Sequence, residues 1–242
     1  MRSASVIEEL RARIASIEGV ATRHAVLPFG IAAIDAHLPG GGIASGALHE
    51  VAGSRNLSDD AAATIFLAGI LARTDGMVVW ALRWADLFAP SLAQAGLDAD
   101  RVIFVEAGSD TNVLIAMEEA LRHPGLAGVV GELGKIGLTA SRRLQLAAET
   151  SGVPAFVFRR AAKDEGETGG TAAVTRWRVR SSPSERLTIP SLARPRWQVA
   201  LERARGGEPH LWTVEASDAQ GRLALPAELV DRPLAEARRV AS

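Results

Sequence analysis

The sequence predicts an α/β fold in which a mostly parallel sheet is flanked by helices, extended by C-terminal antiparallel strands and preceded by an N-terminal helix. Two observations indicate this fold. Between residues 46 and 158, short apolar runs alternate with helical patterns, which is typical of βαβ units whose sheet is buried on both faces. After residue 158, apolar runs follow one another without helices between them, as in an antiparallel meander.

The chain begins with an amphipathic pattern over residues 5–18. Its apolar positions recur at helical spacing, and they are Val6, Leu10, Ile14 and Ile17. This stripe predicts a helix that ends near Gly19. Because so apolar a stripe is unstable in water, we expect it to dock on a neighbouring molecule or on the chain's own core. A turn-rich stretch follows.

The elements of the core can be assigned in order along the chain. The predicted strands are 47–51, 77–82, 101–106, 126–130 and 154–158. The predicted helices are 60–73, 86–94, 110–122 and 140–150, with Asp110 as the N-cap of the third. Residues 159–171 are polar and rich in glycine, which predicts a mobile loop. The strands expected after it are 174–180, 197–203, 211–215 and 222–225.

We therefore expect one domain with an appendage at each end. The N-terminal helix and linker would comprise residues 1–26, the domain 27–226, and a C-terminal tail 227–242.

The composition excludes several classes of protein. Hydrophobic residues make up 48% of the 242 residues, which is enough for a buried core and excludes wholesale disorder. The absence of cysteine excludes disulfide scaffolds, thiolate metal sites and a cysteine nucleophile. The five histidines form no metal-binding motif, and no GxSxG elbow occurs. Without a long apolar run or a signal peptide, we expect a cytoplasmic protein with no membrane partner.

The formal net charge of −1 hides an uneven distribution. Residues 1–158 carry more acidic than basic side chains, and the remainder carries more basic ones. The excess of basic residues is largest over residues 171–206, which contain eight arginines and two glutamates. This asymmetry permits an anionic partner for the C-terminal third.

The loop after the first core strand is where such folds bind phosphate, at the N-terminus of the next helix. Gly53 can serve as the first glycine of a P-loop, but the positions of the second glycine, the lysine and the hydroxyl residue hold Ser58, Asp59 and Asp60. A triphosphate would meet two carboxylates there, and like charges about 4 Å apart cost about 1–4 kcal/mol per pair. The sequence predicts neither a nucleotide cofactor nor a metal.

The next strand ends lack the expected catalytic acids as well. The strand 77–82 leads into Arg83 and Trp84. The strand 126–130 is followed by Gly131 and Glu132, so that the carboxylate comes one position later than a Walker-B aspartate would. Glu132 is therefore a weak metal candidate, and a capping or surface role is the alternative.

Several motifs resemble the RecA recombinase core. The lead-in 27–35, followed by Gly41, Gly42, Gly46 and Glu50, is similar to the RecA lead-in. Two further segments, 142–149 and 194–207, are rich in arginine, and the second contains a tryptophan and precedes Trp212. Together they resemble the ImuA (inducible mutagenesis protein A) family of RecA-like, SulA-related proteins, over residues 5 to 226.

This resemblance implies an SOS-induced accessory factor in error-prone translesion DNA synthesis. Its implied partners are an ImuB-type Y-family polymerase homologue, a DnaE-type error-prone polymerase and RecA. The N-terminal helix matches the helix through which RecA protomers dock. Residues 159–171 take the place of a RecA loop that contacts DNA, so single-stranded DNA is a further possible partner.

The basic residues of the C-terminal half and of helix 140–150 are candidates for binding DNA or a protein. They are Arg142, Arg143, Arg159, Arg160, Lys163, Arg176, Arg178, Arg180, Arg194, Arg196, Arg203 and Arg205. Strand alternation puts the three arginines of 176–180 on one face with Trp177 on the other, and puts Arg203 on the face of Trp197. The alternative is a solvated or ion-paired face above core tryptophans.

Three functions remain open on the sequence alone. The first is a non-enzymatic adaptor in mutagenic translesion synthesis. The second is a DNA-dependent ATPase that uses a displaced cation such as Lys135 or Arg55. The third is a SulA-like inhibitor that binds the division protein FtsZ.

Overall fold

The computed structural model describes residues 25–54, 56–160, 170–184 and 193–226. Several predictions lie outside these ranges. They are the helix 5–18 with its docking residues Val6, Leu10, Ile14 and Ile17, the candidate Lys163, the alternative cation Arg55 and the tail 227–242.

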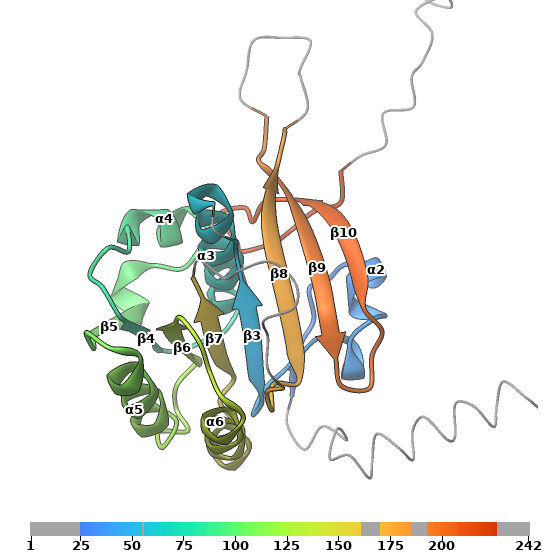
Figure 1. The fold of residues 1–242 in the computed structure, drawn as a ribbon. Coiled ribbons are helices and arrows are strands. Elements are labelled where there is room, and N and C mark those ends of the chain that lie inside the picture. Colours follow the sequence, from blue (N-terminus) through green and yellow to red (C-terminus); the bar gives the residue numbers. More distant parts are fainter. Residues whose placement is uncertain (1–24, 55, 161–169, 185–192, 227–242) are drawn as a thin grey trace, which may run out of the picture.

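An eight-stranded sheet forms the centre of the molecule (Figure 1), in the order β10-β9-β8-β3-β7-β6-β4-β5. Its parallel part consists of β3 (Leu48–Ala52), β4 (Val78–Leu82), β5 (Val102–Glu106), β6 (Gly128–Leu133), β7 (Ala155–Arg159) and β8 (Thr175–Ser182). The antiparallel extension adds β9 (Arg196–Ala204) and β10 (His210–Glu215). The predicted parallel sheet with an antiparallel C-terminal extension is thus confirmed.

Helices cover the sheet from both sides (Figure 1). They are α3 (Leu57–Ala72), α4 (Ala89–Gln94), α5 (Asp110–Ala120) and α6 (Leu138–Ser151). The α5 N-cap is Ser109, whose side chain accepts a hydrogen bond from Asn112 N, so the prediction that Asp110 is the cap is wrong by one residue. No helix among the described residues has the length and apolarity needed to cross a bilayer.

The turn-rich stretch before β3 contains four short elements. They are β1 (Val26–Leu27), α2 (Ala32–Asp35), the 3₁₀ turn η1 (Pro39–Gly41) and β2 (Ile43–Ala44), with β1 antiparallel to β2. The Asp35 carboxylate accepts hydrogen bonds from the backbone N–H groups of Phe29, Gly30 and Ile31. This side chain therefore fixes the turn that leads into α2. A second 3₁₀ turn, η2 (Ala99–Arg101), precedes β5.

The core has one apolar layer on each face of the sheet, as expected for buried parallel strands. The layer under α3 includes Phe66, Trp80 and Trp177, each at most 1% exposed. The layer under α5 and α6 includes Met117 and Leu144, both fully buried. Trp197 and Trp212 also lie in the first layer, which confirms their prediction as core residues.

The prediction of a strand over residues 222–225 is wrong. Only an isolated bridge between Glu215 and Ala224 forms there. The Asp218 carboxylate accepts a hydrogen bond from Arg222 N, Arg194 donates to Arg222 O, and Gly221 adopts a positive φ of 72°. Because side chains satisfy the backbone of Arg222, this segment is a turn.

Candidate functional site

The loop between β3 and α3 is the place where this kind of fold would hold phosphate. Asn56 caps α3 by accepting a hydrogen bond from Ser58 N. The Asp59 carboxylate accepts three hydrogen bonds, from Ser54 Oγ at 2.7 Å, Ser181 N at 2.7 Å and Ser181 Oγ at 2.8 Å. This carboxylate therefore ties the loop to β8, 122 residues away in the chain.

The electrostatics of Asp59 favour its charged form. Burial by itself would raise the pKa of this carboxyl, but the hydrogen bonds from Ser54 and Ser181 and the charge of Arg180 outweigh that effect and lower the pKa. At neutral pH, Asp59 is therefore negatively charged in the first turn of α3, where it interacts favourably with the helix dipole.

The loop also packs closely against the first turn of α3. A Cβ atom at Gly53 would lie 2.3 Å from Asp60 Oδ1 and 2.7 Å from Asp60 N. Asp59 and Asp60 are each 7% exposed. At the predicted P-loop positions Gly53, Ser58, Asp59 and Asp60, the glycine therefore packs directly against Asp60, and both carboxylates are buried.

Glu132 lies at the end of β6 and is only 2% exposed, so the alternative of a surface role is wrong. Its carboxylate accepts hydrogen bonds from Trp80 Nε1 at 3.0 Å and from Arg160 Nη1 at 3.1 Å. Arg160 also pairs with Asp86 at 2.6 Å. Burial raises the pKa of Glu132, although Trp80 and Arg160 act in the opposite direction. Both Glu132 oxygens thus have partners from the chain itself.

The segment between β4 and α4 carries two exposed aromatic side chains, of which the sequence marked only Trp84, as one of two residues standing where a catalytic acid was expected. Arg83 lies 5.2 Å from the ring centre of Trp84 and forms an ion pair of 3.3 Å with Asp110. Trp84 is 58% exposed and Phe88 is 67% exposed. Among the described residues, no three His, Cys, Asp or Glu side chains gather as they would around a metal.

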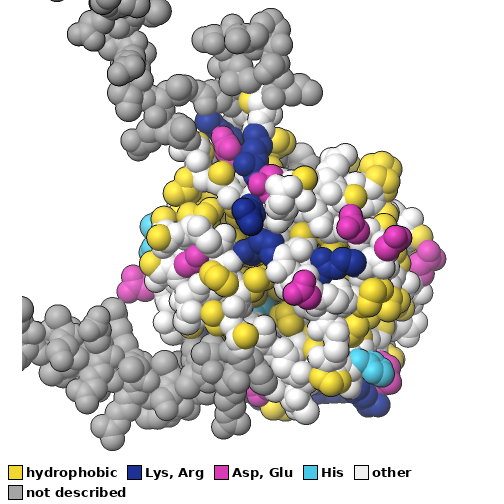
Figure 2. Space-filling view, turned by 180° about the vertical axis from the view of Figure 1, so that it is seen from behind, with side chains coloured by type: hydrophobic (Ala, Val, Ile, Leu, Met, Phe, Trp, Pro, Cys, Tyr) yellow, Lys and Arg dark blue, Asp and Glu magenta, His cyan; other side chains and the backbone are white. Residues whose placement is uncertain are grey.

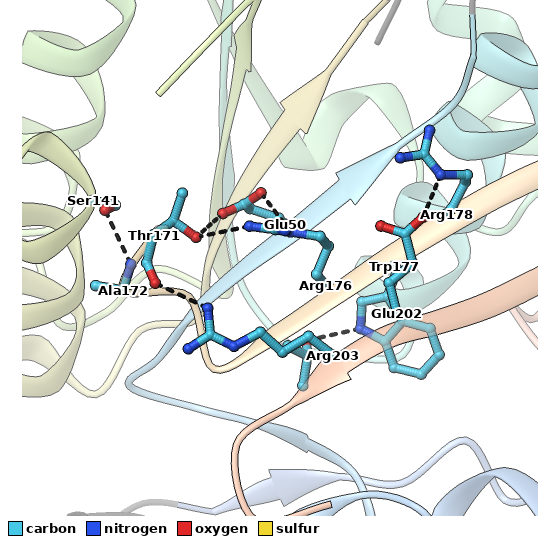
Figure 3. A network of polar contacts seen from close by, with 10 residues as sticks. Glu50, Ser141, Thr171, Ala172, Arg176, Trp177, Arg178, Glu202 and Arg203 are labelled. Carbon is cyan, nitrogen blue, oxygen red and sulfur yellow. Dashed lines mark hydrogen bonds and ion pairs between the residues drawn. The ribbon is translucent and has the colours of Figure 1, made fainter. Parts of the chain in front are cut away.

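A polar network extends across β3, β8 and β9 (Figure 3). Glu50 is 1% exposed, and its carboxylate accepts hydrogen bonds from Thr171 Oγ1 and, at 3.2 Å, from Arg176 Nε. Arg176 also contacts Thr171 Oγ1 at 3.3 Å, and Ser141 of α6 accepts a hydrogen bond from Ala172 N at 3.0 Å. The network therefore fixes the segment that leads into β8 against both α6 and the sheet.

Arg178 and Arg159 are buried on the same face of the sheet. Arg178 is 4% exposed, pairs with Glu202 and donates to Gly53 O at 3.2 Å. Arg159 is the last residue of β7, which corrects its assignment to the loop 159–171. It is 8% exposed, and its Nε has no hydrogen-bond partner among the described residues. Burial lowers the pKa of this guanidinium, while the charge of Glu50 raises it.

Arg203 lies on the opposite face of the sheet from the one predicted. The register of β8 with β9 shifts between Arg176 and Trp177, so that Arg203 is opposite Arg176 and Leu201 is opposite Trp177. This β-bulge inserts Glu202 as an extra residue and interrupts the alternation of side chains. Arg203 therefore reaches Thr171 O, to which it donates at 3.2 Å (Figure 3).

No family model matches the chain. Two curated relatives do, each called protein ImuA, from the Caulobacter vibrioides strains NA1000 / CB15N and ATCC 19089 / CIP 103742 / CB 15. Each is 40% identical over 214 residues, which cover 83% of this chain and 87% of the relative. The chain belongs to the ImuA family.

The fold of this ImuA-family chain is RecA-like. The crystal structure of the RadB recombinase superposes on it with a TM-score of 0.55 at 18% sequence identity, covering 83% of this chain and 99% of RadB. At that identity the similarity concerns the fold alone. The RecA-like fold expected from the motifs is confirmed.

The basic candidates of this ImuA-family chain include two groups. Arg143, Arg160, Arg176, Arg178 and Arg194 form ion pairs with acidic residues of the chain. Arg142, Arg203 and Arg205 instead lie together beside α6, around one cavity. Arg180 and Arg196 also have contacts within the chain.

Proposed function

We propose that this chain is a non-catalytic, RecA-like adaptor in SOS-induced error-prone translesion DNA synthesis. Its proposed partners are an ImuB-type Y-family polymerase homologue and a DnaE-type error-prone polymerase, with RecA as a further partner. The proposal places it in the cytoplasm, where DNA and these polymerases are. Membership of the ImuA family supports the process, and the occupied phosphate site supports the absence of catalysis.

The single observation that carries the proposal is the state of Asp59. Three hydrogen bonds hold its carboxylate in the first turn of α3, where a nucleotide-binding protein needs an open anion site. A triphosphate could enter only by displacing this carboxylate from Ser54 and Ser181 and by approaching a second carboxylate, that of Asp60. Neither the P-loop lysine nor its hydroxyl residue is present to offset this repulsion.

A role as adaptor uses the rest of the fold as a scaffold. The RecA-like sheet and its buried ion pairs hold surface groups in fixed positions without chemistry at the strand ends. Partner binding would then depend on exposed side chains and be independent of nucleotide.

The experiment combines genetics with affinity purification. Deleting the gene is expected to lower damage-induced mutation frequency, and expressing the tagged full chain is expected to restore it and to capture the ImuB-type homologue without added nucleotide. Lys135→Ala, a change at an exposed side chain, is expected to restore mutagenesis fully. Loss of mutagenesis in Lys135→Ala or Arg55→Ala would favour the alternative of a DNA-dependent ATPase. No change on deletion and no captured polymerase would contradict the proposal.

A further inference from the structure

A cavity of about 440 Å³ lies between α6 and the ends of β8 and β9, a volume within the range of about 300–1,000 Å³ typical of ligand sites. The α6 wall contributes Leu138, Arg142 and Leu146, and the opposite wall contributes Arg203 and Arg205. All of them except Leu138 come from the two arginine-rich segments, 142–149 and 194–207, that are separate in the sequence. The fold therefore brings both segments to one place, which we call the α6 groove.

The α6 groove is positively charged. Arg203 donates to Thr171 O and Arg205 to Ala172 O, each at 3.2 Å. Backbone carbonyls orient these guanidinium groups without neutralising them. Arg142 is exposed and has no ion pair within the described ranges, whereas its neighbour Arg143 pairs with Glu118. Among the described residues, no carboxylate lines the groove, and none forms an ion pair with these three arginines.

The α6 groove also has an apolar component. Leu138, Arg142 and Leu146 are spaced four residues apart, so they lie in one stripe along the helix. This stripe is separate from the face of α6 that packs on the sheet, which includes Leu144 and Ala148. Leu138 is 43% exposed and Leu146 is 62% exposed. The stripe therefore presents leucines on both sides of a guanidinium that forms no ion pair with any described residue.

On the face opposite to that of Figure 1, basic and acidic side chains are mixed. Figure 2 views the molecule from the side opposite to that of Figure 1 and shows acidic side chains close to the basic ones.

We propose that the α6 groove binds an acidic peptide segment of a partner protein, with carboxylates on its arginines and apolar side chains on Leu138 and Leu146. The inference rests on the proposed role as adaptor and names the chemistry of the segment that the adaptor would hold. A guanidinium binds a carboxylate through charge-assisted, often bidentate hydrogen bonds. The exposed leucines require an occupant that also has apolar groups.

A peptide fits these observations better than a nucleic acid does. The phosphodiester backbone has no apolar group to cover two leucines. Proteins that bind single strands also stack bases on aromatic side chains, and no aromatic residue of the described part of the chain lines the α6 groove. The mixture of cations and leucines therefore favours an acidic, leucine-containing peptide.

The test measures fluorescence anisotropy of a labelled fifteen-residue peptide of glutamate and leucine, titrated with the full chain. Arg142→Glu is expected to weaken binding at least about tenfold, since a hydrogen bond to a charged group contributes about 1.5–3 kcal/mol. Leu146→Ser is expected to weaken it severalfold. Arg143→Glu, whose wild-type side chain is already paired, is the matched control and is expected to leave the affinity unchanged.

Three results would overturn the inference. They are no saturable binding at millimolar peptide, equal binding of a peptide with glutamine in place of glutamate, and equal losses in Arg142→Glu and Arg143→Glu. Full displacement of the peptide by an oligothymidylate would assign the groove to nucleic acid instead. Peptide binding with this mutational pattern, together with failure to capture a polymerase, would support the groove and contradict the proposed function. Capture of a polymerase without peptide binding would contradict only the inference about the α6 groove.

Discussion

Replacing Glu50 by glutamine removes the only negative charge that contacts Arg176 among the described residues. The carboxylate is 1% exposed, and the Arg176 side chain is 13% exposed. At 3.2 Å and an effective dielectric constant of 20, their Coulomb attraction is about 5 kcal/mol before desolvation. Leaving one member of a buried pair without its partner costs about 3–5 kcal/mol. Because glutamine can still accept the hydrogen bond from Thr171, we expect the free energy of unfolding to fall by about 3 kcal/mol, the lower end of this range.

Urea unfolding followed by tryptophan fluorescence measures this loss, and calorimetry gives the change in Tm. For a chain of this size, 3 kcal/mol corresponds to about 6–12 °C. The matched control is Glu118→Gln, which breaks the pair with Arg143. Since the Arg143 side chain is 66% exposed, that pair contributes about 1 kcal/mol or less. Equal losses of stability in the two variants would refute the conclusion that the Glu50 network fixes the segment leading into β8 against α6 and the sheet.

Three further predictions concern the buried groups around β3. Burial lowers the pKa of His49 to about 4 despite its hydrogen bond with Ala44 O. Between pH 6.5 and 4, His49 is therefore protonated in the unfolded chain but neutral in the folded chain. The free energy of unfolding falls by about 3 kcal/mol over this range. Urea unfolding at several pH values is expected to show a flatter profile in His49→Gln, and equal profiles would contradict this. The lowered pKa of Asp59 stabilises the fold above the carboxyl's unfolded pKa of about 4, and this contribution is lost as pH falls through the folded pKa. Asp59→Asn is therefore expected to differ from wild type at pH 7 but much less at pH 2, and a constant difference would be evidence against the carboxylate contacts. Gly53→Ala puts a Cβ 2.7 Å from Asp60 N and is expected to cost about 1–3 kcal/mol, whereas an unchanged melting curve would mean that the loop is less tightly packed.

The phosphate loop could be identified from the sequence because its chemistry depends on local spacing. Asp59 and Asp60 stand at fixed distances from Gly53, so the absence of the lysine and of the hydroxyl residue is visible in the sequence. The partner Ser181 was not predictable, because it lies 122 residues further along the chain. Its contact with Asp59 depends on β8 pairing directly with β3, and no local pattern encodes that pairing.

The parallel core was predictable because each strand is an apolar run between helical patterns. The prediction of a strand over 222–225 failed because a short apolar run does not show which groups accept the backbone hydrogen bonds. The carboxylate of Asp218 accepts the hydrogen bond from the backbone N–H of Arg222. The face of Arg203 was missed for a related reason. A single inserted residue, Glu202, reverses the alternation, and nothing in the sequence marks it as a bulge.

The arginines show most clearly what a sequence leaves undecided. Arg142 and Arg143 are adjacent and chemically identical, yet Arg143 pairs with Glu118 of α5 and Arg142 lines the α6 groove. The distinction depends on which side of α6 faces α5. Charge patterning predicts a basic region, but only the packing of elements decides which charges remain available to a partner.

The central claim, that carboxylates of the chain occupy the phosphate site, is tested most directly by calorimetric titration of the full chain with Mg-ATP. We predict no saturable binding at millimolar nucleotide and no hydrolysis, with or without single-stranded DNA. Saturable, magnesium-dependent binding at micromolar ATP would contradict the claim, most clearly if Asp59→Ala or Lys135→Ala abolished it.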